Sequence, residues 1–149
     1  MEPIIRVLLD TSVIVAALVE SHSNHERAFP WLKRAKAGEF ELVISAHTIA
    51  EVYAVLTRLP IRPRIQPAVA EVLIRENILK VCEPVALTAE DYSTVVQSQA
   101  EKGLPGGSIY DAIIARVALN AKVDQLVTLN PADFKRVWNG EAKIIIEPE

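Results

Sequence analysis

Ile4-Ile5-Arg6-Val7-Leu8-Leu9-Asp10-Thr11-Ser12 (residues 4–12) passes from an apolar segment into three polar residues. Residues 4–9 predict a buried β-strand, because the run is short, apolar and rich in branched side chains. The next segment is ambiguous, since Val13-Ile14-Val15 favours a strand by propensity. Asp10-Thr11-Ser12 is typical of a helix N-terminus, so we predict a helix from Thr11 to Val19.

The rest of the chain alternates between short apolar runs and longer amphipathic segments. We predict further helices at residues 25–37, 46–58, 67–79, 88–101, 108–121 and 131–137, and strands at residues 41–45, 80–85, 126–128 and 143–146. Strands that alternate with helices indicate an α/β fold whose parallel sheet is covered on both faces. No repeat, low-complexity tract or long linker divides the 149 residues, so we expect a single domain, residues 1–149.

The composition is that of a globular protein, with 50% hydrophobic and 23% charged residues. No apolar run approaches the roughly 18 residues that span a bilayer. Glu2, Arg6 and Asp10 interrupt the apolar N-terminus and no cleavage site follows, which argues against a secretory signal. The one cysteine, Cys82, cannot form an internal disulfide and is interpreted as a small core residue. These features fit a cytoplasmic protein.

The net charge of −3 is not that of a general polyanion binder, which is usually basic. Four arginines nevertheless gather in one region, Arg58, Arg62, Arg64 and Arg75. They form either a local basic patch or a solvated loop and helix face, and the sequence leaves both interpretations open.

Four acids follow hydrophobic runs or stand near the starts of predicted helices: Asp10, Glu51, Asp111 and Asp133. Ligands of open α/β sheets bind outside the carboxyl ends of the strands, where acids from separate segments can meet. Helix capping is the alternative explanation for each acid. Asp10 can cap its own helix, and the other three fit capping-box patterns: Thr48-x-x-Glu51, Ser108-x-x-Asp111 and Asn130-x-x-Asp133.

The segment around Asp111 gives the clearest argument for a ligand. In Asp-Ala-Ile-Ile-Ala-Arg-Val-Ala-Leu-Asn-Ala, residues 111–121, the only charged side chains are Asp111 and Arg116. The helix should therefore be largely buried. Arg116 is rotated by about 140° from Asp111 on ideal helix geometry, so it is not an obvious partner. A buried carboxylate needs a partner, and a metal ion is a good candidate.

Electrostatics supports the same hypothesis. Two carboxylates about 4 Å apart repel by roughly 1 kcal/mol in water and about 4 kcal/mol at an effective dielectric of 20. Four clustered carboxylates would destabilise the fold by on the order of 10 kcal/mol unless a cation joined them. Oxygen ligands favour Mg²⁺ or Mn²⁺ over Zn²⁺. His47 and Glu51 could share a zinc ion, but no HExxH motif or cysteine cluster supports this, and we interpret them as a surface pair.

Four blocks of the sequence resemble the PIN-domain ribonucleases, and most closely the small VapC-type toxins of toxin–antitoxin pairs. The blocks are Leu8-Leu9-Asp10-Thr11-Ser12, Ser45-Ala46-His47-Thr48-Ile49-Ala50-Glu51-Val52, Tyr110-Asp111-Ala112-Ile113-Ile114-Ala115 and Leu126-Val127-Thr128-Leu129-Asn130-Pro131-Ala132-Asp133-Phe134. The resemblance runs from about residue 5 to residue 146 and keeps the order of the blocks. It implies a three-layer α/β/α sandwich with a central parallel sheet of about five strands.

The resemblance also implies the site residues. Asp10, Glu51 and Asp111 match the three central acidic positions of the family. Many relatives carry the fourth acid two residues after the threonine that matches Thr128, where this chain has Asn130. We favour Asp133, which stands just before Phe134 as in some toxins of this type, with Asn130 as a neutral neighbour or ligand. Thr11 or Ser12 matches a hydroxyl position that orients a metal-bound water.

The function that these matches imply is Mg²⁺- or Mn²⁺-dependent cleavage of RNA by a metal-activated water. The resemblance further implies a homodimer and inhibition by a small antitoxin protein. The alternative is a catalytically weak or silent PIN module that binds RNA or protein, because Asn130 replaces an acid.

Overall fold

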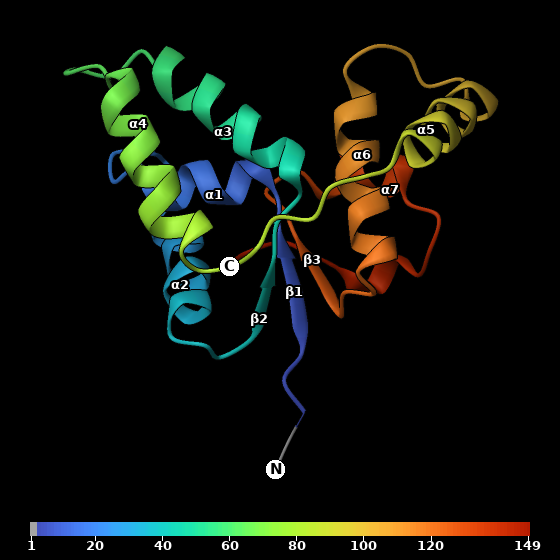
Figure 1. Ribbon diagram of the computed structural model, residues 1–149, viewed down its shortest axis with the longest axis horizontal. Coiled ribbons are helices and arrows are strands. Elements are labelled where there is room, and N and C mark those ends of the chain that lie inside the picture. The colour runs from blue at the N-terminus through green and yellow to red at the C-terminus, as the bar shows by residue number, and fades with distance from the viewer. Residues whose placement is uncertain (1–2) are drawn as a thin grey trace.

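Four parallel strands form the centre of the fold, in the order β2-β1-β3-β4 (Figure 1). The strands are β1 (Arg6–Leu9), β2 (Glu41–Val43), β3 (Gln125–Val127) and β4 (Ile145–Ile146). This computed structural model describes residues 3–149. The predicted α/β architecture with a parallel sheet is therefore confirmed.

Helices cover both faces of the sheet and make the three layers visible in Figure 1. The helices are α1 (Thr11–Leu18), α2 (His25–Lys36), α3 (Ala46–Arg58), α4 (Pro67–Ile74), the π-helix η1 (Arg75–Leu79), α5 (Ala89–Lys102), α6 (Ser108–Asn120), α7 (Pro131–Val137) and the 3₁₀-helix η2 (Ala142–Ile144). Helices α1 to α4 pack on one face, and α5 to α7 pack on the other. Within residues 3–149, none of the helices has the length and apolar character needed to cross a membrane.

The central strand β1 explains why the fold has two cores. Successive side chains of a strand point to opposite faces of the sheet. Val7 and Leu9 therefore join the cluster beneath α1 to α4, whereas Leu8 joins the cluster beneath α5 to α7. All three side chains are fully buried, as the continuous apolar run predicts.

The strand predicted at residues 80–85 is wrong, and the sheet has four strands rather than about five. The backbone N–H groups of Val81 and Cys82 both donate to the carbonyl of Ile78, which keeps the chain in a turn after η1. Only an isolated parallel bridge between Ser45 and Val85 forms beside β2. The turn that follows η1 thus occupies the first residues of the predicted strand and leaves only Val85 to pair.

Truncation of Leu8 tests this packing. Leu8→Ala should lower the free energy of unfolding by about 2–5 kcal/mol, because it leaves a cavity beneath α6. Urea unfolding followed by circular dichroism measures the change. Val96 on α5 is 54% exposed, so Val96→Ala is a matched control that should change stability by less than about 0.5 kcal/mol. Equal effects of the two substitutions would contradict the assignment of the core.

Candidate active site

Asp10 lies at the carboxyl end of the central strand and caps helix α1. Its Oδ1 accepts hydrogen bonds from the hydroxyl of Ser12 at 2.7 Å and the backbone N–H of Val13 at 3.0 Å. Its Oδ2 accepts from the hydroxyl of Thr128 at 2.6 Å, just after β3. A carboxylate has about four acceptor positions, so these three bonds leave one for a ligand.

Burial makes the charge of Asp10 energetically unfavourable. The side chain is 3% exposed. Loss of solvation raises the pKa of this carboxyl from 3.8 to about 6, although the hydrogen bonds from Thr128, Ser12 and Val13 lower it. The negative charge of Glu51 raises it further. A cation beside Asp10 would oppose both of the unfavourable effects.

Glu51 reaches the same region from helix α3. The hydroxyl of Thr11 donates to Oε1 of Glu51 at 3.0 Å and lies 3.2 Å from the hydroxyl of Thr48. Thr11 follows Asp10 directly, so this bond ties the start of α1 to the second acid. Nε2 of His47 lies 3.4 Å from the same oxygen of Glu51.

Asp111 enters from the first turn of helix α6. The predicted burial of this helix is confirmed, because six of its residues are buried, namely Ala112, Ile113, Ile114, Ala115, Val117 and Ala118. Arg116 is paired with Asp91 at 3.2 Å and does not neutralise Asp111. Partial burial, followed by the charges of Asp10, Asp133 and Glu51, raises the pKa of Asp111 to about 6.

A cavity of about 430 Å³ joins these acids. Asp10, Glu51 and Asp111 line it together with Thr11, Ser12 and Asn130. Across residues 3–149, no three His, Cys, Asp or Glu side chains are placed as joint direct ligands of one metal ion. The cavity therefore gathers negative charge and oxygen atoms around a space that a hydrated cation and a phosphate can share.

The two candidates for the fourth position lie differently. Asn130 lines the cavity, and its backbone N–H donates to the hydroxyl of Thr128 at 2.9 Å. Asp133 forms an ion pair with Arg136 on the same helix, α7. Its charge nevertheless raises the pKa of Asp111. Asp133 thus lies outside the cavity lining, whereas the neutral Asn130 is part of it.

Capping explains some of the acids but not all of them. Asp10 caps α1, and the Thr88–Asp91 capping box forms at the start of α5. Helix α3, however, begins after Ser45, which caps it in place of Thr48. Helix α6 follows Gly107, which provides no side-chain cap. Glu51 and Asp111 consequently have no capping role, and their positions need another explanation.

Two side chains beside the acids were not predicted. His22 and Asn24, in the turn between α1 and α2, line the same cavity. Their sequence resembles an ordinary helix entry, and only the folding of α2 against α1 brings them to the acids. The predicted surface pair of His47 and Glu51 is half right, because the two side chains are in contact but only 22% and 29% exposed.

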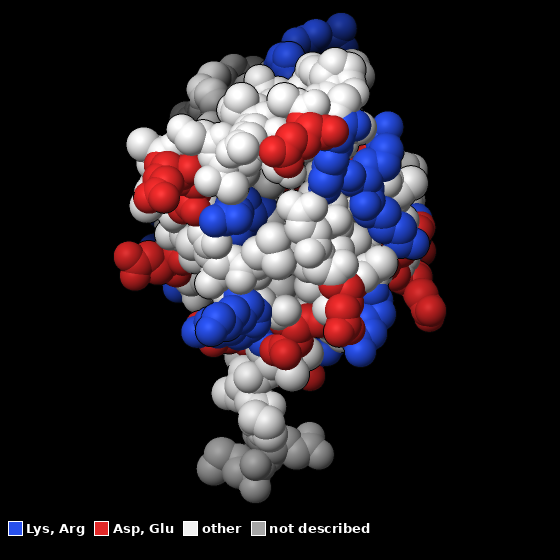
Figure 2. Space-filling model, turned by 90° about the vertical axis from the view of Figure 1, so that its right-hand side faces the viewer, with Lys and Arg blue, Asp and Glu red and all other residues white. Residues whose placement is uncertain are grey.

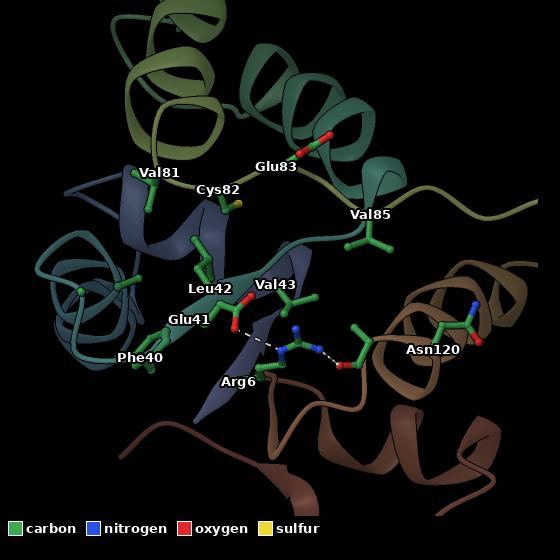
Figure 3. Close-up of a pocket in the computed structure, with 13 residues that line it drawn as sticks. Arg6, Phe40, Glu41, Leu42, Val43, Val81, Cys82, Glu83, Val85 and Asn120 are labelled. Atoms are coloured by element: carbon green, nitrogen blue, oxygen red, sulfur yellow. Dashed lines mark hydrogen bonds and ion pairs between the residues drawn. The ribbon is translucent and has the colours of Figure 1, made fainter. Parts of the chain in front are cut away.

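A second cavity, of about 560 Å³, lies away from the acids between β2 and residues 81–85 (Figure 3). Glu41 in its wall is paired with Arg6 at 3.1 Å. Burial raises the pKa of the Cys82 thiol to about 11, which keeps the thiol protonated and weakly reactive. Cys82 packs against the core as expected, and we assign no chemistry to it.

The surface charges are mixed in sign. Figure 2 shows basic and acidic side chains interspersed on the face that carries α5 to α7. In the arginine-rich region, all four arginines are exposed, and Arg75 is paired with Glu71 and Glu76. Arg62 and Arg64 lie in the loop before α4. Arg75 is thus neutralised by its neighbours, and the choice between a basic patch and a solvated face rests on Arg58, Arg62 and Arg64.

Comparisons with known proteins agree with this geometry. Residues 7–138 match the PIN domain family. Ribonuclease VapC27 of Mycobacterium tuberculosis is 31% identical over 116 residues, which are 78% of this chain and 79% of the relative.

Two solved structures share the fold. VapC20 of Mycobacterium tuberculosis, described as a Sarcin-Ricin loop cleaving toxin, aligns with a TM-score of 0.63 and 19% identity over 80% of this chain and 86% of its own. FitAB bound to a DNA fragment aligns with a TM-score of 0.66 and 20% identity over 95% of this chain and 94% of its own. The chain therefore belongs to the PIN-domain family, together with the VapC ribonucleases.

Proposed function

We propose that the chain is an endoribonuclease that requires Mg²⁺ or Mn²⁺ and acts in the cytoplasm as the toxin of a toxin–antitoxin pair. The observation that carries this proposal is the single cavity lined by Asp10, Glu51 and Asp111. The similarity to VapC27, a ribonuclease, supports RNA as the substrate.

The residues fit a hard divalent cation. All the acids offer oxygen, which Mg²⁺ and Mn²⁺ prefer. Burial, followed by the negative charges of neighbouring acids, raises the pKa values of Asp10 and Asp111, and a bound cation would oppose both effects. Mg²⁺ commonly binds through one or two carboxylates and keeps waters or substrate phosphates as its other ligands. A site with few direct protein ligands therefore suits it.

The acids take different roles in this proposal. Asp10 and Asp111 would hold the cation. When bound, the cation would supply a water of lowered pKa and polarise the scissile phosphate. Glu51, which Thr11 holds by a hydrogen bond, orients the attacking water. Cleavage of the P–O3′ bond leaves a 5′-phosphate and a 3′-hydroxyl.

The alternative is a silent PIN module that binds RNA or protein. Two observations favour it: Asn130 rather than an acid lines the cavity, and no three ligating side chains within residues 3–149 converge on one point. Titration with Mg²⁺ distinguishes the two functions. Only the enzyme has to bind the metal ion at millimolar concentrations or below.

A protein partner is part of the proposal. The antitoxin would place a basic side chain near the acids, since an arginine can replace the charge of the cation. Exposed apolar side chains on α3, α4 and η1, namely Tyr53, Val72 and Leu79, support binding to protein, as does the likeness to FitAB. We also propose that the chain forms a homodimer.

Asp10→Asn should abolish metal-dependent RNA cleavage and leave the fold intact. The rate should fall by more than about 100-fold, because loss of groups that only support metal ligands already lowers activity 10–100-fold. Cleavage of total RNA, with sequencing of the new 5′ ends, measures the effect. Glu90→Gln, an exposed acid on α5, is the matched control and should cut normally. Wild-type cleavage by Asp10→Asn would refute the site.

The metal-free protein should lose stability as the pH rises. The pKa of Asp10 is raised from 3.8 to about 6, so the folded state binds more protons than the unfolded chain between those values. The free energy of unfolding should therefore fall across this window, by on the order of 3 kcal/mol from Asp10. Urea unfolding in EDTA at pH 4 and pH 6.5 measures it.

Asp10→Asn is the control for this pH effect and should make the dependence weaker, leaving the part that comes from the raised pKa of Asp111. At pH 7, Mg²⁺ should raise the melting temperature of the wild type but not that of the variant, since it binds only the folded site. Equal pH profiles and equal responses to Mg²⁺ in the two proteins would contradict a cation at Asp10.

Asp133→Asn should reduce cleavage less than Asp111→Asn does, by less than about tenfold, because Arg136 already balances the charge of Asp133. Single-turnover cleavage at saturating Mg²⁺ compares the two variants. Equal losses would make Asp133 an inner member of the site.

A further inference from the structure

An aromatic pair stands beside the acids and has no role in the proposed cleavage. His47 on α3 and Tyr110 on α6 stack with ring centroids 5.2 Å apart and planes inclined by 6°. Figure 1 shows these two helices on either side of the carboxyl ends of the central strands. The stack therefore joins the two halves of the fold at the edge of the acidic site.

His47 lies next to the acids on one side. Its Nε2 is buried, lies 3.4 Å from Oε1 of Glu51, and has no hydrogen-bond partner among residues 3–149. The imidazole thus fills the space between a proposed catalytic acid and the tyrosine ring. It packs against one face of that ring.

Tyr110 is open on its remaining surface. The residue is 49% exposed although it stacks on His47, and it directly precedes Asp111 in the chain. A planar group stacked on the free part of this ring would therefore lie beside the entrance of Asp111 to the cavity, because Tyr110 and Asp111 are consecutive residues.

We propose that Tyr110, supported by His47, is the stacking platform for one nucleobase of a single-stranded RNA whose scissile phosphate lies at the acids. The inference rests on the proposed RNA cleavage. Bases of single-stranded RNA are recognised largely by stacking on aromatic side chains. The chain has a net charge of −3 and surface charges of mixed sign, so attraction of phosphates alone is a weak source of affinity (Figure 2).

Stacking of this kind tolerates every base, because each has a π-face. The platform should therefore require that a base be present at one position next to the cleaved bond, with little regard to its identity. Because the ring of Tyr110 already stacks on His47, we expect it to lose less conformational freedom on binding a base than an unstacked tyrosine would.

Abasic substitution tests the platform. A short oligoribonucleotide that the wild type cuts is prepared with an abasic residue at each position around the cleaved bond. At one position the abasic residue should lower kcat/KM about tenfold for the wild type. Tyr110→Leu should lose about the same factor on the intact RNA and show no further loss with that abasic substrate.

Two controls separate stacking from a structural role. Tyr110→Phe keeps the ring and should keep the dependence on the base. Tyr92→Leu removes a tyrosine of similar exposure, 42%, from α5 and should behave as the wild type. The platform would be overturned if, at every position, the losses from Tyr110→Leu and from the abasic residue multiplied independently. Wild-type kinetics of Tyr110→Leu on the intact RNA would also overturn it.

A binding measurement tests the platform without relying on RNA cleavage. Oligoribonucleotides with 2-aminopurine at successive positions are added to metal-free protein, and quenching of the fluorescence reports stacking. If the wild type quenches the fluorescence at one position and Tyr110→Leu does not, the platform is supported. This holds even if the wild type cuts no RNA, and then only the proposed nuclease activity fails. Equal quenching by both proteins, or none at any position, overturns the platform.

Discussion

The buried carboxylate of Asp10 holds together the parts of the chain on which the site depends. Its three hydrogen bonds join the end of β1, the first turn of α1 and the residue after β3. The hydroxyl of Ser12 extends the network, because it also accepts the backbone N–H of Leu129 at 3.1 Å. These bonds fix the relative positions of two neighbouring strands, while burial opposes the charge that makes them strong. The same group therefore orders the fold and would be stabilised in its charged form by the proposed cation.

Hydroxyl side chains organise the other acids around this point. Thr11 connects Glu51 to the start of α1, and Thr128 connects Asp10 to the segment that carries Asn130. Asp111 lines the same cavity from the first turn of α6, whose buried residues are otherwise apolar, and no hydroxyl among residues 3–149 donates a hydrogen bond to it. Hydrogen bonds thus position the acids on the side of α1 and α3, whereas burial and the charges of the other acids act on Asp111 on the side of α6. A cation and a phosphate would complete it from the open side of the cavity.

The sequence predicts most of the elements because local signals and long-range packing agree. The cap at Asp10 outweighs the strand propensity of Val13-Ile14-Val15, and α1 forms as expected. The predicted fifth strand fails because the turn after η1 bonds the N–H groups of residues 80–82 back to the helix, so that only Val85 pairs beside Ser45.

The geometry of the site is harder to predict from the sequence alone than the fold is. Glu51 and Asp111 fit capping-box patterns in the sequence, yet Ser45 caps α3 and no side chain caps α6, so neither acid has that role. The Thr11–Glu51 bond and the His47–Tyr110 stack depend on how elements far apart in the chain meet, and no local pattern encodes that.

The edge of the sheet at β2 has a consequence for behaviour in concentrated solution. Unpaired edges of β-sheets are templates for association with other chains, and proteins protect them with short strands and charges. Here β2 has only three residues, and Arg6 and Glu41 form an ion pair beside it. The bridge from Val85 covers the chain just past its carboxyl end. This edge therefore resists fibrous self-association even though the strand itself is apolar.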